Sequence, residues 1–160
     1  MSNVSEEILH EYMHAKGLTI STAESCTGGA IANRITDVSG ASRVFGHGWV
    51  TYANEAKQQH LGLPAELFEK HGAVSEEVAR AMAEGALKQS GADHAISVTG
   101  IAGPTGGTPE KPVGTVWIGI ASANGVTAHR RLNAFDRETF KSVTSQHALE
   151  LLRLTIMRQG

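Results

Sequence analysis

The sequence predicts an α/β protein, a three-layer α/β/α sandwich in which helices cover both faces of a mixed sheet. Helical and extended segments alternate along most of its 160 residues, and the last two predicted strands form a hairpin. The length fits a single domain over residues 1–160, and a hydrophobic content of 41% is enough for a substantial core. The segments below are the basis of this prediction.

The composition argues against several classes of protein. The 14 basic and 16 acidic residues give a formal charge of −2, and no basic run occurs, so neither nucleic acid nor a membrane surface is expected as a partner. Cys26 is the only cysteine, which excludes an internal disulfide and a multi-cysteine metal site. No apolar run approaches the roughly 20 residues of a membrane span, and the N-terminus lacks a signal-peptide core. We therefore expect a cytoplasmic protein.

The first helix is predicted over residues 4–16 from an apolar stripe at helical spacing, formed by Val4, Ile8, Leu9, Tyr12 and Met13. This helix contains the segment His10-Glu11-Tyr12-Met13-His14, which matches the zinc-protease pattern His-Glu-x-x-His. Both histidines fall on the side facing away from the apolar stripe, whereas a zinc protease buries them and adds a third ligand. We interpret the match as a coincidence and expect no metal and no other cofactor.

An extended segment at 18–20 and a predicted helix over 27–36 enclose a turn of unusual composition. Residues 21–29 hold four hydroxyl groups, a carboxylate and a thiol before two glycines. Unpaired N–H groups at a helix N-terminus stabilise a phosphate or a developing oxyanion. Ser25, just ahead of those donors, is a plausible nucleophile. The alternative is that Ser25 or Thr27 only caps the helix.

A strand is predicted over residues 43–52, followed by a helix over 55–61 with Asn54 as its N-cap. Lys57 then lies in the first turn, where the helix dipole disfavours a cation by about 0.3–1 kcal/mol, or up to about 2 kcal/mol when partly buried. A lysine that acts as a general base near neutral pH needs a pKa about three units below its usual value of about 10.4. Burial would have to supply most of that decrease. An exposed, protonated lysine is the alternative.

The sequence next predicts a short helix over 64–69, a longer helix over 75–90 and a strand over 95–99. A glycine-rich segment and a hairpin follow them. The segment Gly100–Pro112 holds four glycines and three prolines, so its amides are available to an anion, but it lacks the Walker pattern. Strands over 113–121 and 126–132 are joined by Ala123-Asn124-Gly125, a hairpin signal. The alternative to anion binding is that Gly100–Pro112 is an ordinary rigid connection.

The last helix is predicted from Asp136, as its cap, to about Met157. Arg137 in its first turn has the wrong sign for the helix dipole. An anionic ligand explains an arginine held there better than helix stability does, although Asp136 and Glu138 could simply neutralise it.

Several segments together resemble the CinA C-terminal domain family, whose stand-alone members are the PncC-type nicotinamide mononucleotide deamidases. The segments are Thr22-Ala23-Glu24-Ser25-Cys26-Thr27-Gly28-Gly29, Val50-Thr51-Tyr52-Ala53-Asn54-Glu55-Ala56-Lys57, His71-Gly72-Ala73-Val74-Ser75, and Thr99 to Pro104 with Lys111 to Thr115. The resemblance covers nearly the whole chain. It implies the hydrolysis of nicotinamide mononucleotide to nicotinate mononucleotide and ammonia.

The resemblance also implies roles for individual residues. Ser25 would be the nucleophile, Lys57 its general base, and Tyr52 a hydroxyl that orients or relays the proton. Amides near residues 26–29 would stabilise the oxyanion, and the glycine-rich loop and the last helix would hold the ribose phosphate. The implied substrate-binding residues are Thr27, Gly28, Gly29, Thr99, Gly100, Gly103, Gly106, Gly107 and Arg137. The expected partner is a small nucleotide, and we expect a homo-oligomer.

Two other interpretations stay open at this point. In the first, Cys26 is the nucleophile, assisted by Glu24 or a histidine, because a thiolate is intrinsically more reactive than a serine hydroxyl. In the second, the protein is a non-catalytic nucleotide-binding module or a competence- or damage-associated protein, and Ser25 is only a helix cap. Ammonia release from nicotinamide mononucleotide distinguishes an amidase from a binding module.

Overall fold

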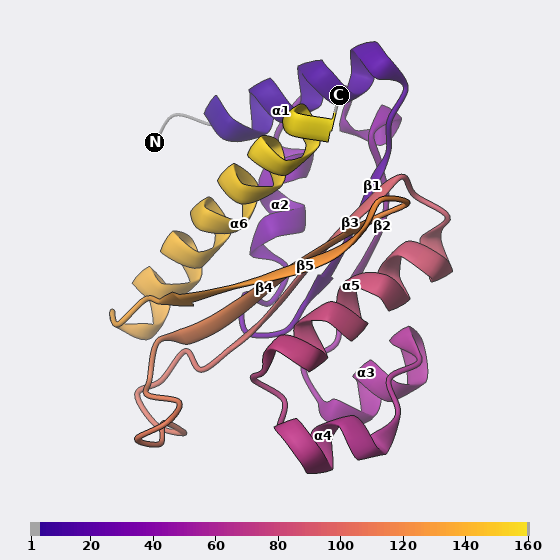
Figure 1. The fold of residues 1–160 in the computed structure, drawn as a ribbon. Coiled ribbons are helices and arrows are strands. Elements are labelled where there is room, and N and C mark those ends of the chain that lie inside the picture. Colours follow the sequence, from indigo (N-terminus) through magenta and orange to yellow (C-terminus); the bar gives the residue numbers. More distant parts are fainter. Residues whose placement is uncertain (1–3, 160) are drawn as a thin grey trace.

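A five-stranded mixed sheet forms the centre of the molecule in the computed structural model, which describes residues 4–159 (Figure 1). The strand order is β2-β1-β3-β4-β5. The three strands β2 (Phe45–Val50), β1 (Ile20–Glu24) and β3 (His94–Gly100) are parallel. The hairpin of β4 (Thr115–Ser122) and β5 (Gly125–Leu132) adds two antiparallel strands. The predicted mixed sheet and its hairpin are confirmed.

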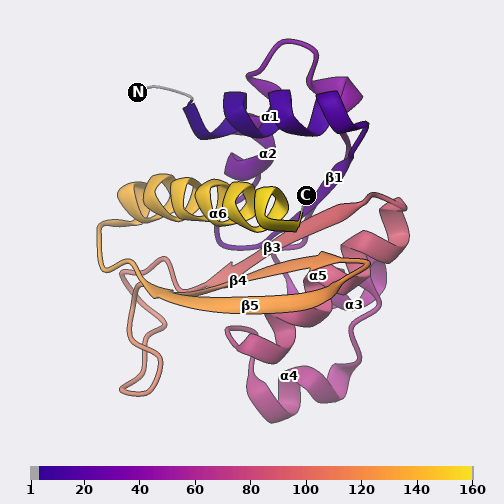
Figure 2. The ribbon, with the colours of Figure 1, turned by 45° about the horizontal axis from the view of Figure 1, so that its top comes forward.

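Helices cover both faces of this sheet, as predicted (Figures 1 and 2). One face carries α1 (Val4–Lys16), α2 (Ala30–Thr36) and α6 (Arg137–Gln159). The other carries α3 (Asn54–Leu61), α4 (Ala65–His71) and α5 (Glu76–Ser90). A short 3₁₀ turn, Ala41–Arg43, precedes β2. The α/β/α sandwich is therefore the observed architecture, and no helix within residues 4–159 is both long and apolar enough to cross a membrane.

Each face of the sheet has its own hydrophobic core, because side chains alternate between the two faces along a strand. Ile20 and Ile96 point into the larger cluster, which also contains Phe140 and Leu149 of α6. Ala23 points into the smaller cluster, formed with α5. The small side chains on that second face bring the helices close to the sheet.

Three local predictions are corrected by the structure. In α1 the buried face contains Leu9 and Met13, but Val4 and Ile8 of the predicted stripe are exposed. The second helix begins at Ala30 rather than near residue 27, because the two preceding glycines have positive φ angles of 62° and 102°. Asn54 is already inside α3, and Ala53 occupies the N-cap position without a side-chain hydrogen bond.

The connections between the parallel strands locate a topological switch point. From β1 the chain returns through α2 on one face to reach β2, and from β2 it crosses the other face through α3, α4 and α5 to reach β3. In open α/β sheets, ligands bind beyond the carboxyl ends of the strands at such a point. Here the point lies where β1 and β3 end, so the residues after Glu24 and near Gly100 define the place to look for a site.

Candidate active site

Ser25 directly follows β1 and continues the hydrogen-bonding pattern of the sheet. Its amide donates to the carbonyl of Val98 in β3 at 3.0 Å, and the amide of Thr51 donates to the carbonyl of Glu24 at 2.9 Å. Ser25 is therefore flanked by Thr51 on one side and Thr99 on the other. Since neighbours in a parallel sheet project to the same face, these three side chains lie on the face covered by α3 and α5.

Lys57 lies in the first turns of α3 and is buried, with only 1% of its surface exposed. Its amine donates to the backbone carbonyl of Tyr52 at 3.2 Å, and no ion pair within residues 4–159 includes it. Burial lowers the pKa of the amine, and the opposing influences of Cys26 and Glu55 are weaker. The alternative of an exposed lysine is wrong, and burial shifts the pKa of the amine in the direction that a general base requires.

Cys26 is also buried, and its chemistry differs from that of a reactive cysteine. Burial raises the pKa of its thiol to about 12, so the group is a neutral thiol near pH 7. The sulfur packs against Gly100, where an added Cβ would lie 3.1 Å from it. These observations oppose Cys26 as the nucleophile and show that Gly100 permits close packing.

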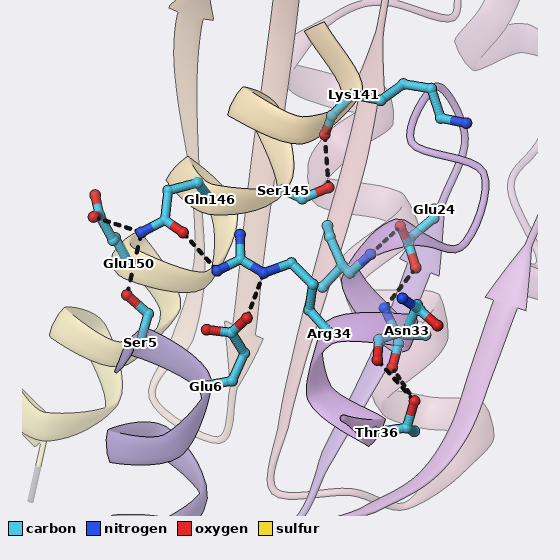
Figure 3. Close-up of polar contacts among 12 residues, drawn as sticks. Ser5, Glu6, Glu24, Asn33, Arg34, Thr36, Lys141, Ser145, Gln146 and Glu150 are labelled. Carbon is cyan, nitrogen blue, oxygen red and sulfur yellow. Dashed lines mark hydrogen bonds and ion pairs between the residues drawn. The ribbon is translucent and has the colours of Figure 1, made fainter. Parts of the chain in front are cut away.

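Glu24 occupies the position where an external anion was expected. Its buried carboxylate accepts hydrogen bonds from the amides of Ile31 and Ala32 at 2.9 and 3.0 Å, at the start of α2 (Figure 3). The Thr27 hydroxyl donates to the same carboxylate at 2.6 Å. The start of α2 is thus filled by a carboxylate of the chain itself, and the Thr27 hydroxyl proton is not free for a substrate. The amides of Ile31 and Ala32 are therefore not available to an external anion.

The turn before α2 still offers hydrogen-bond donors. The amide of Gly28 donates to the carbonyl of Ser25 at 3.0 Å, whereas the amides of Thr27 and Gly29 have no partner among residues 4–159. Both lie within four residues of Ser25. The positive φ angles of Gly28 and Gly29 create this turn, and a side chain at either position would strain it.

Arg137 connects the start of α6 with two other parts of the site. It donates to the Tyr52 hydroxyl at 2.6 Å and to the carbonyl of Gly103 at 2.8 Å. No ion pair with Asp136 or Glu138 is present in the described part of the chain. Tyr52 therefore has two separate contacts, with its hydroxyl on Arg137 and its backbone carbonyl on Lys57. Its predicted role in moving a proton stays a prediction.

The remaining predicted binding residues divide into two groups. The buried Thr99 hydroxyl donates to the carbonyl of Ala73 at 2.8 Å, so it holds the segment before α5 in place. Gly106 and Gly107 lie in the exposed part of the glycine-rich loop. None of the hydrogen bonds between residues 4 and 159 joins these two glycines to Ser25, Lys57 or Arg137. Their part in binding stays a prediction.

Lys141 belongs to the site, although the sequence analysis did not identify it. It follows Arg137 by one turn of α6, and its amine lies 3.7 Å from where a Cβ on Gly28 would be. Neither Arg137 nor Lys141 is in an ion pair within the described residues. The sequence signal that could have revealed Lys141 is the pair of basic residues four apart at a helix start, where the dipole favours acidic ones.

A separate cavity lies away from these residues. It has a volume of about 550 Å³ and opens at the other end of the sheet, between Tyr12, His94 and Asn124. None of the predicted site residues lines it. We place the candidate site at the carboxyl ends of the parallel strands, because Ser25 follows β1 there and the buried Lys57 belongs to the helix over the same sheet face.

The fold and the site define a class of protein, an α/β sandwich with a serine and a buried lysine beyond the carboxyl ends of parallel strands. Residues 2–156 match the model of the CinA C-terminal domain family. The chain belongs to this family.

Relatives and solved structures agree with this membership. A CinA-like protein from Akkermansia muciniphila is 57% identical over 139 residues, which cover 86% of this chain and 34% of that protein. One from Geobacter sulfurreducens is 48% identical over 155 residues, 97% of this chain and 38% of that protein. The chain thus spans little more than a third of the length of these relatives.

Crystal structures of similar size share the fold. The competence/damage inducible protein CihA from Agrobacterium tumefaciens is 43% identical, with a TM-score of 0.89 over 95% of this chain and 94% of that one. A CinA superfamily protein from Klebsiella pneumoniae is 31% identical, with a TM-score of 0.93 over 98% of each chain.

Proposed function

We propose that the protein is an amidohydrolase that converts nicotinamide mononucleotide to nicotinate mononucleotide and ammonia, as the family resemblance implies. The observation that carries this proposal is the buried amine of Lys57, which has no carboxylate partner in the described part of the chain and belongs to the helix over the sheet face of Ser25. An amine kept neutral beside a serine is the arrangement that activates a hydroxyl nucleophile.

The reaction proceeds in two halves. The neutral amine of Lys57 takes the proton of the Ser25 hydroxyl, and the oxygen forms a bond to the carboxamide carbon. The amides of Thr27 and Gly29 donate hydrogen bonds to the oxyanion of the tetrahedral intermediate, a contribution of roughly 3 kcal/mol for each donor in comparable sites. Lys57 returns its proton to the nitrogen as the carbon–nitrogen bond breaks. Ammonia leaves, and an ester of Ser25 remains.

Water completes the second half. Lys57 takes a proton from the water, whose oxygen attacks the ester carbon, and the proton passes to the Ser25 oxygen as the carbon–oxygen bond breaks. Nicotinate mononucleotide is released with its new carboxylate. The enzyme returns to its initial protonation state without a metal or redox cofactor.

The substrate phosphate is assigned to the cations at the start of α6. Arg137 and Lys141 carry two positive charges without acidic partners, and the Arg137 guanidinium can bind two phosphate oxygens at once. The loop from Gly100 to Gly107 lies beside Arg137 through the contact with Gly103. When Arg137 binds the phosphate, the Tyr52 hydroxyl becomes free to orient the proton between Ser25 and Lys57.

Ammonia release from nicotinamide mononucleotide tests this function. Purified wild-type protein is expected to release one ammonia for each nicotinate mononucleotide formed, and Ser25→Ala is expected to release almost none. Ser21→Ala is a matched control, because Ser21 is a buried serine of β1 on the same sheet face but four residues away from Ser25. Cys26→Ala is expected to retain most of the turnover.

Three results would count against the proposal. Well-folded wild-type protein that releases no ammonia favours the nucleotide-binding module. Activity that survives in Ser25→Ala assigns the nucleophile to another residue, and loss of activity in Cys26→Ala points to the thiol.

The homo-oligomer and the cytoplasmic location stay predictions. The mass of the protein in solution would test the first, and cell fractionation would test the second.

A further inference from the structure

Thr51 is a buried residue to which the site described so far gives no role. Its side chain is almost completely buried, at 1% exposure, and its hydroxyl oxygen has no hydrogen-bond partner among residues 4–159. A buried hydroxyl left without a partner costs about 1–3 kcal/mol. Such a group calls for an explanation, and a ligand that supplies the missing hydrogen bond is one.

The position of Thr51 relates it to both proposed catalytic residues. It lies beside Ser25 in the register of β1 and β2, on the same face of the sheet. The next residue in the chain, Tyr52, holds the amine of Lys57 through its carbonyl. On the other side of Ser25, the hydroxyl of Thr99 is already bonded to Ala73. Thr51 is therefore the flanking threonine whose hydroxyl is unused.

We propose that the hydroxyl of Thr51 accepts a hydrogen bond from the N–H group of the substrate carboxamide and thereby favours an amide over an ester. This inference rests on the proposed function. The oxyanion is directed to the amides of Thr27 and Gly29, which follow Ser25 in the chain. The nitrogen must face Lys57, which protonates it, and Thr51 lies on that side of the nucleophile.

Two substrates that differ only at the leaving group test the proposal, nicotinamide mononucleotide and the methyl ester of nicotinate mononucleotide. The ester has no N–H group, so it cannot donate to Thr51. We expect Thr51→Val to lower kcat/KM for the amide by about 10- to 100-fold and for the ester by less than about threefold. Thr51→Ser, which retains the hydroxyl, is expected to stay within about threefold of the wild type on both substrates.

Thr22→Val is the matched control. Thr22 is also fully buried with an unpartnered hydroxyl, but it belongs to β1 and projects to the opposite face, next to Phe45 and Gly48. This variant is expected to leave both substrates unchanged, so a general effect of removing an orphaned hydroxyl is separated from a contact with the substrate.

Equal losses on amide and ester in Thr51→Val would assign Thr51 a packing role and overturn the inference, as would the absence of any loss. Either result, with wild-type protein still releasing ammonia, leaves the proposed function intact. Wild-type protein that hydrolyses neither substrate overturns the proposed function, and the inference falls with it.

Discussion

Glu6 and Lys57 are both buried ionisable residues, at 2% and 1% exposure, but their surroundings differ. Glu6 of α1 forms an ion pair with Arg34 of α2, and Arg34 also donates to Gln146 of α6 at 2.5 Å (Figure 3). Within residues 4–159, the amine of Lys57, on the other face of the sheet, donates one hydrogen bond, to the backbone carbonyl of Tyr52, and forms no ion pair. The first charge is compensated where it is buried, and the second is not.

The different surroundings of Glu6 and Lys57 fit a structural role for the first residue and the proposed chemical role for the second. A buried ion pair joins elements, and Glu6 with Arg34 connects three helices, among them α6, which carries Arg137 and Lys141. A buried amine without a counterion gives up its proton more readily, because desolvation disfavours the charged form. Such a group weakens the fold slightly and is retained where a neutral amine is needed.

Replacing Lys57 is expected to produce the largest effect. Lys57→Ala and Lys57→Arg should each lower kcat by at least about 10²- to 10⁴-fold, the contribution of a positioned base. Arginine keeps the positive charge but stays protonated, so it cannot take the Ser25 proton. Steady-state ammonia release measures this, with Lys88→Arg on the exposed surface of α5 as control. A wild-type rate in Lys57→Arg would assign the general base to another residue, and the contrast between Glu6 and Lys57 would then have no bearing on catalysis.

Breaking the compensated pair is expected to affect stability instead. Arg34→Met leaves Glu6 buried without its partner and should lower the free energy of unfolding by about 3 kcal/mol in urea titrations. Turnover per folded molecule should change little. Arg43→Met, at an exposed arginine, should stay within about 0.5 kcal/mol of the wild type. If Arg34→Met leaves stability unchanged, Glu6 and Arg34 do not hold these helices together.

Arg137 and Lys141 of α6 form no ion pair within residues 4–159 and provide a third case to compare with Glu6 and Lys57. Their proposed partner is the substrate phosphate. Arg137→Ala should raise KM about tenfold with a smaller change in kcat, as expected when uniform binding is removed. Lys141→Ala should act in the same direction but less strongly. Arg158→Ala, at the far end of the same helix, is the control. An unchanged KM in Arg137→Ala contradicts the assignment.

The smallest effect concerns the pH dependence of stability. Burial lowers the pKa of Lys57 in the folded protein, so between that pKa and the ordinary value near 10.5 the unfolded chain binds more protons than the folded one. The free energy of unfolding of the wild type should therefore rise with pH through this window relative to that of Lys57→Met. Denaturant titrations at several alkaline pH values measure the difference, and parallel curves would show that the amine is charged when folded.

The sequence predicts the layered fold because periodicity, turn signals and caps are local, and Ser75 does cap α5 as expected. The site is harder to predict from the sequence, because its contacts join segments that are far apart in the chain. Nothing local indicates that Glu24 would fill the start of α2, seven and eight residues ahead, or that Arg137 would reach a hydroxyl 85 residues earlier in the chain. Burial of Lys57 likewise depends on packing of α3 against the sheet.

The two contacts of Tyr52 have a consequence for how the protein can vary. Its carbonyl tethers the Lys57 amine, and every amino acid has that carbonyl, so no substitution at position 52 removes the tether. The phenol hydroxyl, which accepts a hydrogen bond from Arg137, can be removed without breaking this tether. A substitution at position 52 can thus remove the proposed proton-orienting hydroxyl and its contact with Arg137 while the amine keeps its anchor.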